Sequence, residues 1–586
     1  MPRTREPEAA RSPPWVFYRS LREFLRQLPG QAQRFWLLVF ATGAIGGLGA
    51  IVLFALLGAV ERHAWPAAPT FLGAVRSASP LRRVLVPALA GLLISVVSLL
   101  ARWPVGGHGT SGILEAVWLR RGRLPLGRAL ARGALSIVAV GMGAPLGREG
   151  ALLQTGAAAG SWLARTFGLT ASQARLLVAC GTASGIAAAY NVPIGGAVFG
   201  LEVILGSFAM DLLGPIVVSC VVATIVSRAF VSGDATYLIP QYALLRPPQV
   251  FLGLAVAPVL GAASAIYVRV LGWAEVRLHL LPAWLRPLLA PLALALVGAA
   301  SIRFPELLGN GYDTVNSALF GDVPLLLLVA LPALKLVATA LSAGAGVPGG
   351  LFTPSLFYGA LIGGAFGNAM GRIWPAAGPP GAYALVGMVG VLAGTTHAPV
   401  SAVLIIFELT GDYGVILPLM LSAALAAATS RALERDSLYT APLRRRGVRL
   451  PAMPRPHWLR STSVATLMSE GAACVSPTTP FQQLMQQLLS LPRGHDLYVC
   501  TPDRELLGAV VLDDLKGTIT DAANLSMILA ADIMDRRPPV ITASMSLAEV
   551  AARFANTDLE RLPVVDQRNR LLGTISIRAI LRRGAF

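Results

Sequence analysis

Long apolar segments, repeatedly interrupted by glycine and proline, dominate the hydrophobic pattern over most of the chain. They begin near Phe35 and recur to about Ala432. Several approach or exceed the roughly 20 residues that a helix needs to cross a bilayer. These are Phe35 to Val60, Val84 to Leu100, Leu212 to Val231, Val250 to Leu271, and Val323 to Leu341. The pattern predicts an all-α polytopic membrane domain.

Other apolar segments are shorter or are cut by glycine and proline. They lie at Ala144 to Leu163, Ala174 to Ala189, Pro193 to Leu205, Gly350 to Phe366, Ala384 to Ala393, and Pro399 to Leu409. Because a full crossing needs more residues than most of these offer, they predict broken helices that stop partway across the membrane.

The broken segments contain an internal repeat. Glu202 lies nine residues after Pro193, and Glu408 lies nine residues after Pro399. A glycine-led motif begins 46 residues before the first of these prolines and 49 residues before the second: Gly147-Arg148-Glu149-Gly150 and Gly350-Leu351-Phe352-Thr353-Pro354. Paired broken segments in two halves indicate an inverted repeat with a midplane binding site. Coincidence in a chain rich in glycine and alanine is the alternative.

After about Arg460 the pattern becomes that of a small soluble α/β domain. Two segments recur with a period of about 65 residues. Val464 to Met468 resembles Ala530 to Met534, and Leu506 to Val511 resembles Leu571 to Ser576. Each repeat predicts an amphipathic helix, at Pro480 to Leu491 and Ser546 to Ala555, followed by strands. The predicted organisation is an N-terminal segment at 1–32, a membrane domain at 33–440, a basic linker at 441–460, and two modules at about 461–525 and 527–586.

Composition supports a membrane protein, since 55% of the residues are hydrophobic and 13% are charged, against about 25% charged in a typical soluble domain. The formal net charge is +18, but arginines cluster beside apolar segments and no aromatic-interleaved basic platform is visible, which argues against nucleic-acid binding. The clusters are Arg3, Arg5, Arg11, Arg19, Arg22 and Arg26, and Arg431, Arg435, Arg444, Arg445, Arg446 and Arg449. The positive-inside rule predicts that both termini are cytoplasmic.

Other function classes find little support in the sequence. A membrane enzyme would use Glu149, His108 and His397, but the six histidines lack ligand spacing and no paired-carboxylate motif is present. The four cysteines, Cys180, Cys220, Cys474 and Cys500, show neither a metal spacing nor a disulfide framework. A nucleotide sensor with a membrane anchor would not need repeated broken helices. We therefore expect no catalytic role, no metal and no obligatory cofactor.

The glycine-led motifs have the chemistry of an anion site. An anion inside a membrane must exchange water for other donors, and unpaired N–H groups at helix N-termini can replace it. Glycine lets the backbone approach the ion, and proline or a small residue starts the helix. Both motifs have this form, and Gly107-His108-Gly109 adds a third short glycine loop.

These three motifs resemble the signatures of the CLC family of chloride channels and proton-coupled chloride transporters. The resemblance runs from about Phe35 to Tyr439, and the tail resembles a tandem pair of CBS domains. It implies transport of chloride and similar small anions through a lipid bilayer, by a homodimer with one pathway per subunit. We expect the protein in a bacterial cytoplasmic (inner) membrane.

Site residues follow from this resemblance. Glu149 matches the gating glutamate, whose carboxylate competes with an anion for one position. A lone carboxylate among apolar residues is itself a functional candidate, although a simple pair with Arg148 is the alternative. The resemblance implies anion contacts from the motif residues and a distal tyrosine, which are His108, Gly147, Arg148, Glu149, Gly150, Gly350, Leu351, Phe352 and Tyr439.

Three departures from the family pattern matter. Ala151 replaces a proline after Gly150, a tolerable change. His108 takes the place of the serine in the first signature, where a shifted alignment would use Ser111 instead. Val203 occupies the position of the inward glutamate that passes protons in exchangers.

Valine cannot carry a proton, so Val203 favours channel-like conduction. A proton-coupled antiporter with another proton route is the alternative, because some exchangers of the family also lack this glutamate. The neighbouring Glu202 has a symmetric partner in Glu408, and a structural role at a helix end fits both. Fluoride export is a minor option.

The CBS pair keeps only parts of a nucleotide site. Asp514 fills the ribose-binding position in the first module, but Val511 replaces the hydroxyl residue near the phosphate. Ser576 is present in the second module, where Ala579 replaces the aspartate. Binding of an adenine nucleotide is therefore doubtful, and a dimerising role is at least as well supported.

Overall fold

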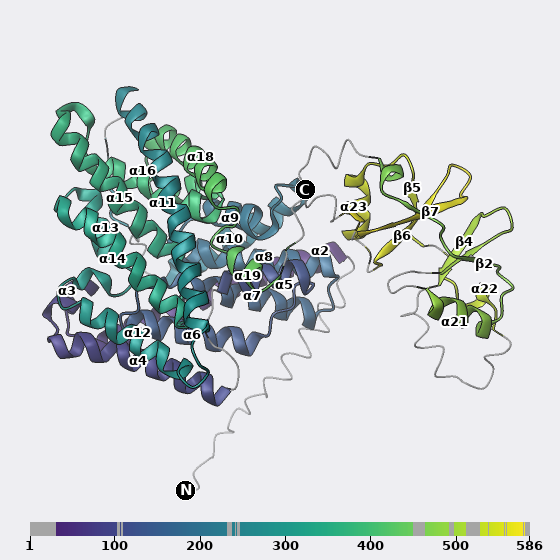
Figure 1. Ribbon diagram of the computed structural model, residues 1–586, viewed down its shortest axis with the longest axis horizontal. Helices are drawn as coiled ribbons and strands as arrows, with labels where there is room; N and C mark the ends of the chain where they lie inside the picture. The colour runs from purple at the N-terminus through teal and green to yellow at the C-terminus, as the bar shows by residue number, and fades with distance from the viewer. Residues whose placement is uncertain are drawn as a thin grey trace, which may run out of the picture. The chain divides into compact units, whose positions relative to one another are not determined.

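The computed structural model describes residues 31–101, 106, 109–230, 237–240, 242, 247–448, 450, 463–491, 497–510, 528–536, 538–555, 557, 559–577 and 579–580. The chain divides into two compact units, Met1–Leu450 and Pro451–Phe586. The first is helical and the second contains all the described strands (Figure 1). This agrees with the predicted fold class, while the domain boundaries proposed from composition stay predictions.

The first unit is built from α-helices of very different lengths. In chain order they are α2 (Gln31–Ala64), α3 (Phe71–Ser77), α4 (Pro80–Ala101), α5 (Gly109–Leu119), α6 (Leu126–Gly141), α7 (Glu149–Thr166), α8 (Ala171–Tyr190), α9 (Pro193–Phe199), α10 (Met210–Phe230), α11 (Pro247–His279), α12 (Arg286–Ala300), α13 (Tyr312–Phe320), α14 (Leu325–Gly344), α15 (Phe352–Ile373), α16 (Pro380–Thr396), α17 (Pro399–Thr410), α18 (Ile416–Leu433) and α19 (Ala441–Arg445). Short helical turns are η1 (Gly200–Leu205, a π-helix), η2 (Pro305–Leu307), η3 (Pro375–Ala377) and η4 (Tyr413–Val415). Within the described residues, six helices are long and apolar enough to cross a membrane.

Broken helices occur where the sequence predicted them. Pro193 and Pro399 each open a short helix, because proline lacks the N–H that a first helical residue leaves unpaired. The first of these continues as η1, where Gly206 then ends the turn with a positive φ of 59°. Helix α17 ends at Gly411, whose φ is 62°.

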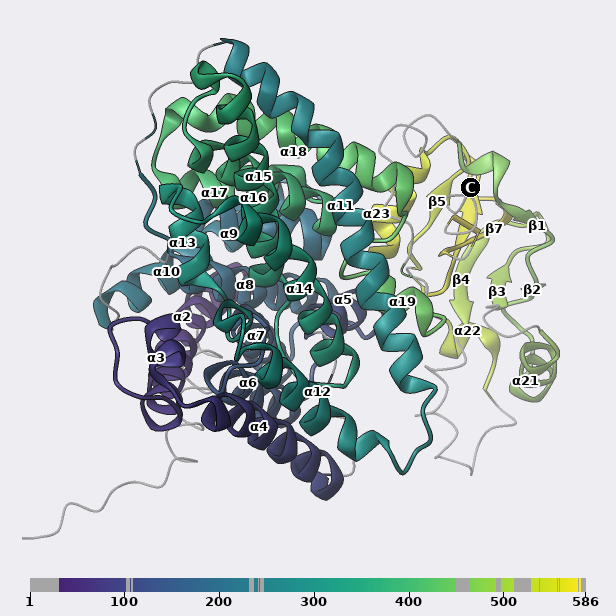
Figure 2. The ribbon, with the colours of Figure 1, turned by 60° about the vertical axis from the view of Figure 1, so that its left-hand side comes forward.

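Each half of the first unit contains a tightly packed helix pair, α7 with α8 and α15 with α16 (Figure 2). Glycines make both contacts possible. A Cβ atom on Gly156 would lie 2.0 Å from the carbonyl oxygen of Gly181, and one on Gly359 would lie 2.3 Å from that of Gly387. The same backbone contact in both halves agrees with the predicted repeat.

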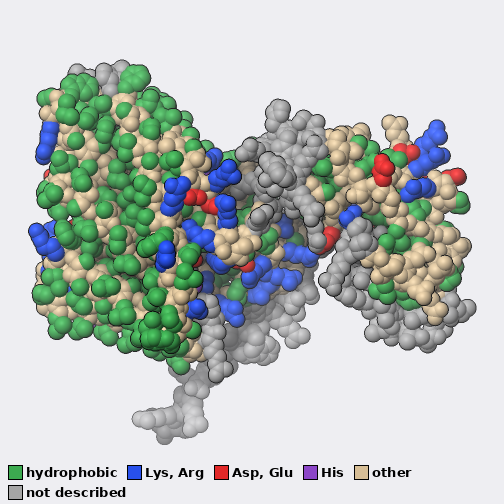
Figure 3. All heavy atoms as spheres, viewed as in Figure 1, with side chains coloured by type: hydrophobic (Ala, Val, Ile, Leu, Met, Phe, Trp, Pro, Cys, Tyr) green, Lys and Arg blue, Asp and Glu red, His purple; other side chains and the backbone are tan. Residues whose placement is uncertain are grey.

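The surface of this unit has the composition expected in a lipid environment. Figure 3 shows hydrophobic side chains over most of its visible face. Large apolar residues such as Leu85, Phe251 and Leu326 are exposed on α4, α11 and α14. Since such contiguous apolar exposure is rare on soluble proteins, the bilayer is the natural solvent for these helices.

The second unit has two small sheets that repeat one pattern. Its elements are η5 (Val464–Thr466), β1 (Ser469–Glu470), β2 (Cys474–Val475), α21 (Phe481–Ser490), β3 (Leu497–Cys500), β4 (Leu506–Val510), α22 (Ala530–Ile533), β5 (Ile541–Thr542), α23 (Leu547–Ala555), β6 (Arg561–Val565) and β7 (Leu571–Ser576). The strand orders are β2-β3-β4 and β1-β7-β6-β5. In each sheet a parallel pair is followed by an antiparallel pair. The order of one strand, a helix and two strands in each repeat agrees with the sequence repeat.

One feature of this unit is not visible in the sequence spacing. Cys474 and Cys500 lie on the neighbouring strands β2 and β3, and their Sγ atoms are 2.8 Å apart. The contact with Cys500, together with Arg504, lowers the pKa of Cys474 to about 7. The two thiols therefore form a local pair, although 26 positions separate them.

Candidate functional site

The two glycine-led motifs meet at the centre of the first unit. Gly147 and Gly350 form an isolated antiparallel bridge, in which each N–H donates to the carbonyl oxygen of the other at 2.8 Å. Gly150 also comes close, since a Cβ atom there would lie 2.8 Å from the Gly350 nitrogen. The bridge brings the N-termini of α7 and α15 together, as the repeat predicts.

Glu149 projects from the start of α7 onto the N-terminus of α15. Its Oε1 accepts hydrogen bonds from the backbone N–H of Phe352 at 2.9 Å and of Thr353 at 3.0 Å. Its Oε2 accepts one from the Thr353 hydroxyl at 2.8 Å and a longer one from the Tyr190 hydroxyl at 3.5 Å. The side chain is buried, with 2% of its surface exposed. Glu149 thus holds a carboxylate where unpaired helix N–H groups converge.

Arg148 does not form the simple pair with Glu149 that was the alternative interpretation. Its guanidinium stacks over the rings of Phe54, at 4.5 Å, and Tyr312, at 5.0 Å. Its Nε is buried without a hydrogen-bond partner in the described part of the chain. The hydrogen bonds to the Glu149 carboxylate therefore come from backbone N–H and hydroxyl donors, while Arg148 contributes positive charge from the side.

A row of aromatic rings continues from this carboxylate. Phe352 lies 5.3 Å from Tyr190 and 6.5 Å from Phe199, measured between ring centroids. Phe199 in turn meets Tyr439 edge-on at 6.1 Å. The structure therefore places Phe352 and Tyr439 in one buried cluster with Glu149.

The residue that contacts Tyr439 helps to align the first signature, where His108 and Ser111 were the two candidates. Ser111, near the start of α5, is buried and donates a hydrogen bond from its hydroxyl to the Tyr439 carbonyl oxygen at 2.8 Å. Gly107 and His108 lie outside the described residues. The choice between His108 and Ser111 at the anion position therefore stays a prediction, although Ser111 does lie beside the cluster.

Glu202 and Glu408 form a reciprocal exchange between the two halves. The Glu202 carboxylate accepts from the Ser401 N–H at 2.7 Å and hydroxyl at 2.6 Å, and from the Val400 N–H at 3.3 Å, at the N-terminus of α17. The Glu408 carboxylate accepts from the N–H groups of Ile194 at 3.0 Å and Gly195 at 2.6 Å, at the N-terminus of α9. Each glutamate caps the helix of the other half, as the predicted structural role requires.

Val203 is buried in the apolar core, with 8% of its surface exposed. It lies in η1 directly after Glu202. The Glu202 carboxylate caps α17 through the N–H groups of Val400 and Ser401. The next residue, Val203, cannot carry a proton.

Of the two residues weighed for nucleotide binding, the structure describes one. Ser576 ends β7, and its hydroxyl accepts a hydrogen bond from the Ala579 N–H at 3.1 Å. Asp514 and Val511 lie outside the described residues.

Sequence reasoning missed three contributors to the site. Thr353 gives two of the donors to Glu149, and its place inside the second glycine-led motif was a usable signal. Tyr190 precedes the Pro193 segment and Phe199 lies within it, but a single aromatic residue in an apolar run carries no distinguishing signal. No cluster of three or more metal-ligating side chains occurs among the described residues.

Comparisons with known proteins agree with this architecture. The family model described as voltage gated chloride channel matches residues 90–431, and the CBS domain model matches residues 530–585. A putative chloride channel protein of the ClcB-like type from Ralstonia nicotianae is 38% identical over 432 residues, which is 71% of this chain and 99% of the relative.

Two solved structures share the fold. A eukaryotic CLC transporter has a TM-score of 0.69 at 21% identity, covering 95% of this chain and 98% of the other. A slow cyanobacterial Cl⁻/H⁺ antiporter has a TM-score of 0.64 at 22% identity, covering 70% and 97%. The helical repeat, the joined glycine motifs and these matches lead to one conclusion: the chain is an integral membrane protein of the CLC family of voltage-gated chloride channels, and it carries CBS domains at its C-terminal end.

Proposed function

We propose that the chain conducts chloride through a pathway gated by the Glu149 side chain. The observation that carries this proposal is the set of donors around its carboxylate, two backbone N–H groups of α15 and one hydroxyl. Such donors can bind a chloride ion in place of a carboxylate. When Glu149 swings away, an anion takes its place and the pathway is open.

Phe352, Leu351 and Tyr439 complete the proposed anion path. Leu351 caps α15 next to Gly350 and Phe352 begins the helix. The buried Tyr439 follows beyond the ring of Phe199. Gly147 and Gly150 leave room for the carboxylate and for the close approach of α15, and Arg148 adds positive charge. His108, outside the described residues, remains a proposed anion contact.

Conduction is proposed to be channel-like, without coupling to protons. Val203 is apolar and buried, and the adjacent Glu202 carboxylate is occupied by the N-terminus of α17. The relative from Ralstonia nicotianae is named a putative chloride channel. The antiporter alternative requires another proton carrier, and the solved cyanobacterial relative is named a Cl⁻/H⁺ antiporter.

The deciding experiment records chloride efflux and proton movement together, from liposomes that contain the purified protein. Chloride flux that drives no uphill proton movement is the expected result. Stoichiometric proton movement would contradict the channel assignment and leave the chloride pathway intact. In that case Glu202→Gln and His108→Ser would test the two candidate proton carriers.

Assembly and placement follow the same family expectation. We propose a homodimer with one pathway per subunit, in a bacterial inner membrane with both termini in the cytoplasm. The arginines in the last turn of α18 and beyond it, including Arg431 and Arg444, support this orientation through the positive-inside rule. The CBS pair is proposed to be chiefly structural, with Asp514 and Ser576 as the residues that a bound adenine nucleotide would contact.

A further inference from the structure

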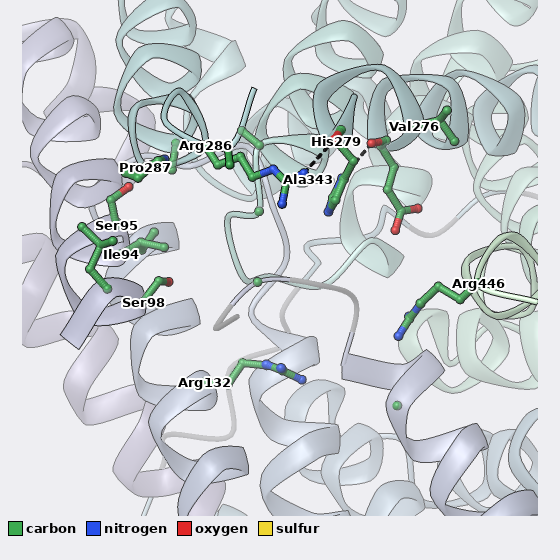
Figure 4. Close-up of a pocket in the computed structure, with 18 of the residues that line it drawn as sticks. Ile94, Ser95, Ser98, Arg132, Val276, His279, Arg286, Pro287, Ala343 and Arg446 are labelled. Carbon is green, nitrogen blue, oxygen red and sulfur yellow. Dashed lines mark hydrogen bonds between the residues drawn. The ribbon is translucent and has the colours of Figure 1, made fainter. Parts of the chain in front are cut away.

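Two polar features of the described chain stand apart from the proposed gate. The basic pocket lined by Arg132 and Arg446 (Figure 4) adjoins the segment after Tyr439 and belongs with the proposed anion pathway. The other feature is the pair of thiols in the C-terminal unit, Cys474 and Cys500. The proposed conduction pathway does not use this pair.

Strand pairing brings the two thiols to one face of a small sheet. Strands β2 and β3 run parallel, and Cys474 lies opposite Tyr498. Because side chains alternate between the two faces of a strand, Cys500 faces the same side as Tyr498, and both belong to one apolar cluster. Cys474 and Cys500 are therefore diagonal neighbours on this face, and their Sγ atoms are 2.8 Å apart.

This separation is close to that of a covalent bond. A disulfide has an S–S length of about 2.05 Å, so bond formation needs a movement of less than about 1 Å. Two neighbouring cysteines can also hold a metal ion, but a structural zinc site takes four ligands. No group of three or more metal-ligating side chains occurs in the described part of the C-terminal unit. The geometry therefore favours chemistry between the two sulfurs.

The two sulfurs differ in exposure and in charge. Cys474 is exposed, whereas only 4% of the surface of Cys500 is exposed. The contact with Cys500, together with the charge of Arg504, lowers the pKa of Cys474. The same contact and burial raise the pKa of Cys500. Because the thiolate is the nucleophile, Cys474 is suited to attack and Cys500 to resolve the product.

We propose that Cys474 and Cys500 form a reversible redox modification site, at which a small-molecule disulfide converts the two thiols into one intramolecular disulfide. The Cys474 thiolate attacks one sulfur of the small disulfide, whose S–S bond breaks and releases one thiolate. Cys500 then loses its proton, and its sulfur attacks Cys474 Sγ and releases the second thiolate. Two protein thiols are oxidised, and one small disulfide is reduced to two thiols, which take up the two protons that the cysteines lose.

The surroundings of the pair suit a reversible site. The C-terminal unit is proposed to be cytoplasmic, and disulfides in the cytosol are usually transient or redox-sensing. Cys500 belongs to a cluster that also contains Val565 and Leu571 of the second repeat. Oxidation therefore takes place where the two modules meet. The inference goes beyond chloride conduction and does not depend on it.

Incubation of the purified full-length protein with glutathione disulfide in non-ionic detergent tests this site. After alkylation of the remaining thiols and proteolysis, mass spectrometry should detect peptides linked through Cys474 and Cys500. Dithiothreitol should return both residues to free thiols. The matched control is Cys180→Ala/Cys220→Ala, which should form the same link because these two buried thiols belong to the membrane unit.

Single variants assign a role to each sulfur. Cys500→Ala removes the resolving thiol and should leave Cys474 in a stable mixed disulfide with glutathione; Cys500→Ser replaces this variant if it does not fold. Cys474→Ala should leave Cys500 as a free thiol over the same time, because that sulfur is buried. Arg504→Gln should slow the first step a fewfold, since it removes a positive charge near the thiolate.

Three results would overturn the proposal. The first is that Cys474 and Cys500 both stay free thiols in excess glutathione disulfide. The second is faster reaction of Cys500 in Cys474→Ala than of Cys474 in Cys500→Ala. The third is equal modification of Cys180 and Cys220 in the wild-type protein, which would identify general oxidation of an opened chain.

Discussion

Three glutamates of the membrane unit place carboxylates at helix N-termini, yet their settings differ. Glu202 and Glu408 form a reciprocal pair, each capping the helix of the other half, and both are only partly buried. Glu149 is fully buried and caps α15. The corresponding position of the second motif is Phe352, so no carboxylate from the second half caps α7 in return.

This asymmetry distinguishes the two structural caps from the proposed gate. Releasing Glu202 would leave donors at α17 without a carboxylate, in a region with no proposed path for a mobile replacement. Releasing Glu149 exposes equivalent donors within the proposed anion path, where chloride can satisfy them. In the proposed function, the same local chemistry serves stability at Glu202 and Glu408 and conduction at Glu149.

The largest expected effect comes from removing the gate itself. Hydrogen bonds to charged groups contribute about 1.5–3 kcal/mol, so Glu149→Ala should shift the pathway toward its open state by about tenfold or more. Chloride efflux from liposomes should rise and lose its dependence on pH, since no carboxylate remains to be protonated. Glu408→Ala is the control and should not open the pathway. Closure of Glu149→Ala in the wild-type manner would refute the gate assignment.

A substitution at Gly147 should open the same gate without changing Glu149 itself. A Cβ atom on Gly147 would lie 2.0 Å from Oε2 and 2.2 Å from Oε1 of Glu149, and the three nearest atoms all belong to that side chain. Gly147→Ala should therefore displace the carboxylate and raise chloride efflux severalfold. In a Glu149→Ala background the same substitution should add nothing. An additional effect there would mean that Gly147 acts through the backbone.

The reciprocal caps should respond in stability instead of flux. Glu202→Ala or Glu408→Ala leaves N–H groups of α17 or α9 without their acceptor, at a cost of about 1–3 kcal/mol each. We expect a lower unfolding temperature in detergent, with chloride efflux per folded protein close to that of the wild type. Constitutive efflux in either variant would remove the distinction between cap and gate.

The smallest effects should rank the donors around Glu149. Thr353→Val removes a hydroxyl donor at 2.8 Å and keeps the backbone N–H, whereas Tyr190→Phe removes a contact of 3.5 Å. Because hydrogen bonds weaken with length, efflux should rise a fewfold in Thr353→Val and less in Tyr190→Phe. The reverse order would indicate that Tyr190 acts mainly through its 2.7 Å contact with the Thr353 hydroxyl.

Much of this architecture follows from local signals. Proline at the starts of α9 and α17 and glycine in both motifs predict where helices break, since these residues limit or free the backbone within a few positions. Glu149 stands out because a carboxylate in an apolar run is costly. Glu202 and Glu408 each lie nine residues after a proline, and this shared position predicted a common role.

Contacts between residues far apart in the chain could not be predicted from the sequence. The sequence does not show that Glu202 caps α17 of the second half and not a helix of the first half, because that depends on how the two repeats face each other. Thr353 and Tyr190 are ordinary residues until the fold places them 2.7 Å apart. The contact between Cys474 and Cys500 is of the same kind, since only strand pairing creates it.

The bridge between Gly147 and Gly350 also has a consequence for the order of synthesis. The donors to Glu149 from α15, and the partners of Glu202 and Glu408, join segments about 200 positions apart. While only the first half has left the ribosome, Glu149 and Glu202 face the membrane interior without these partners. The proposed anion site therefore cannot form in stages. It forms only when the second half inserts, and a chain truncated before α15 should be a substrate for membrane quality control.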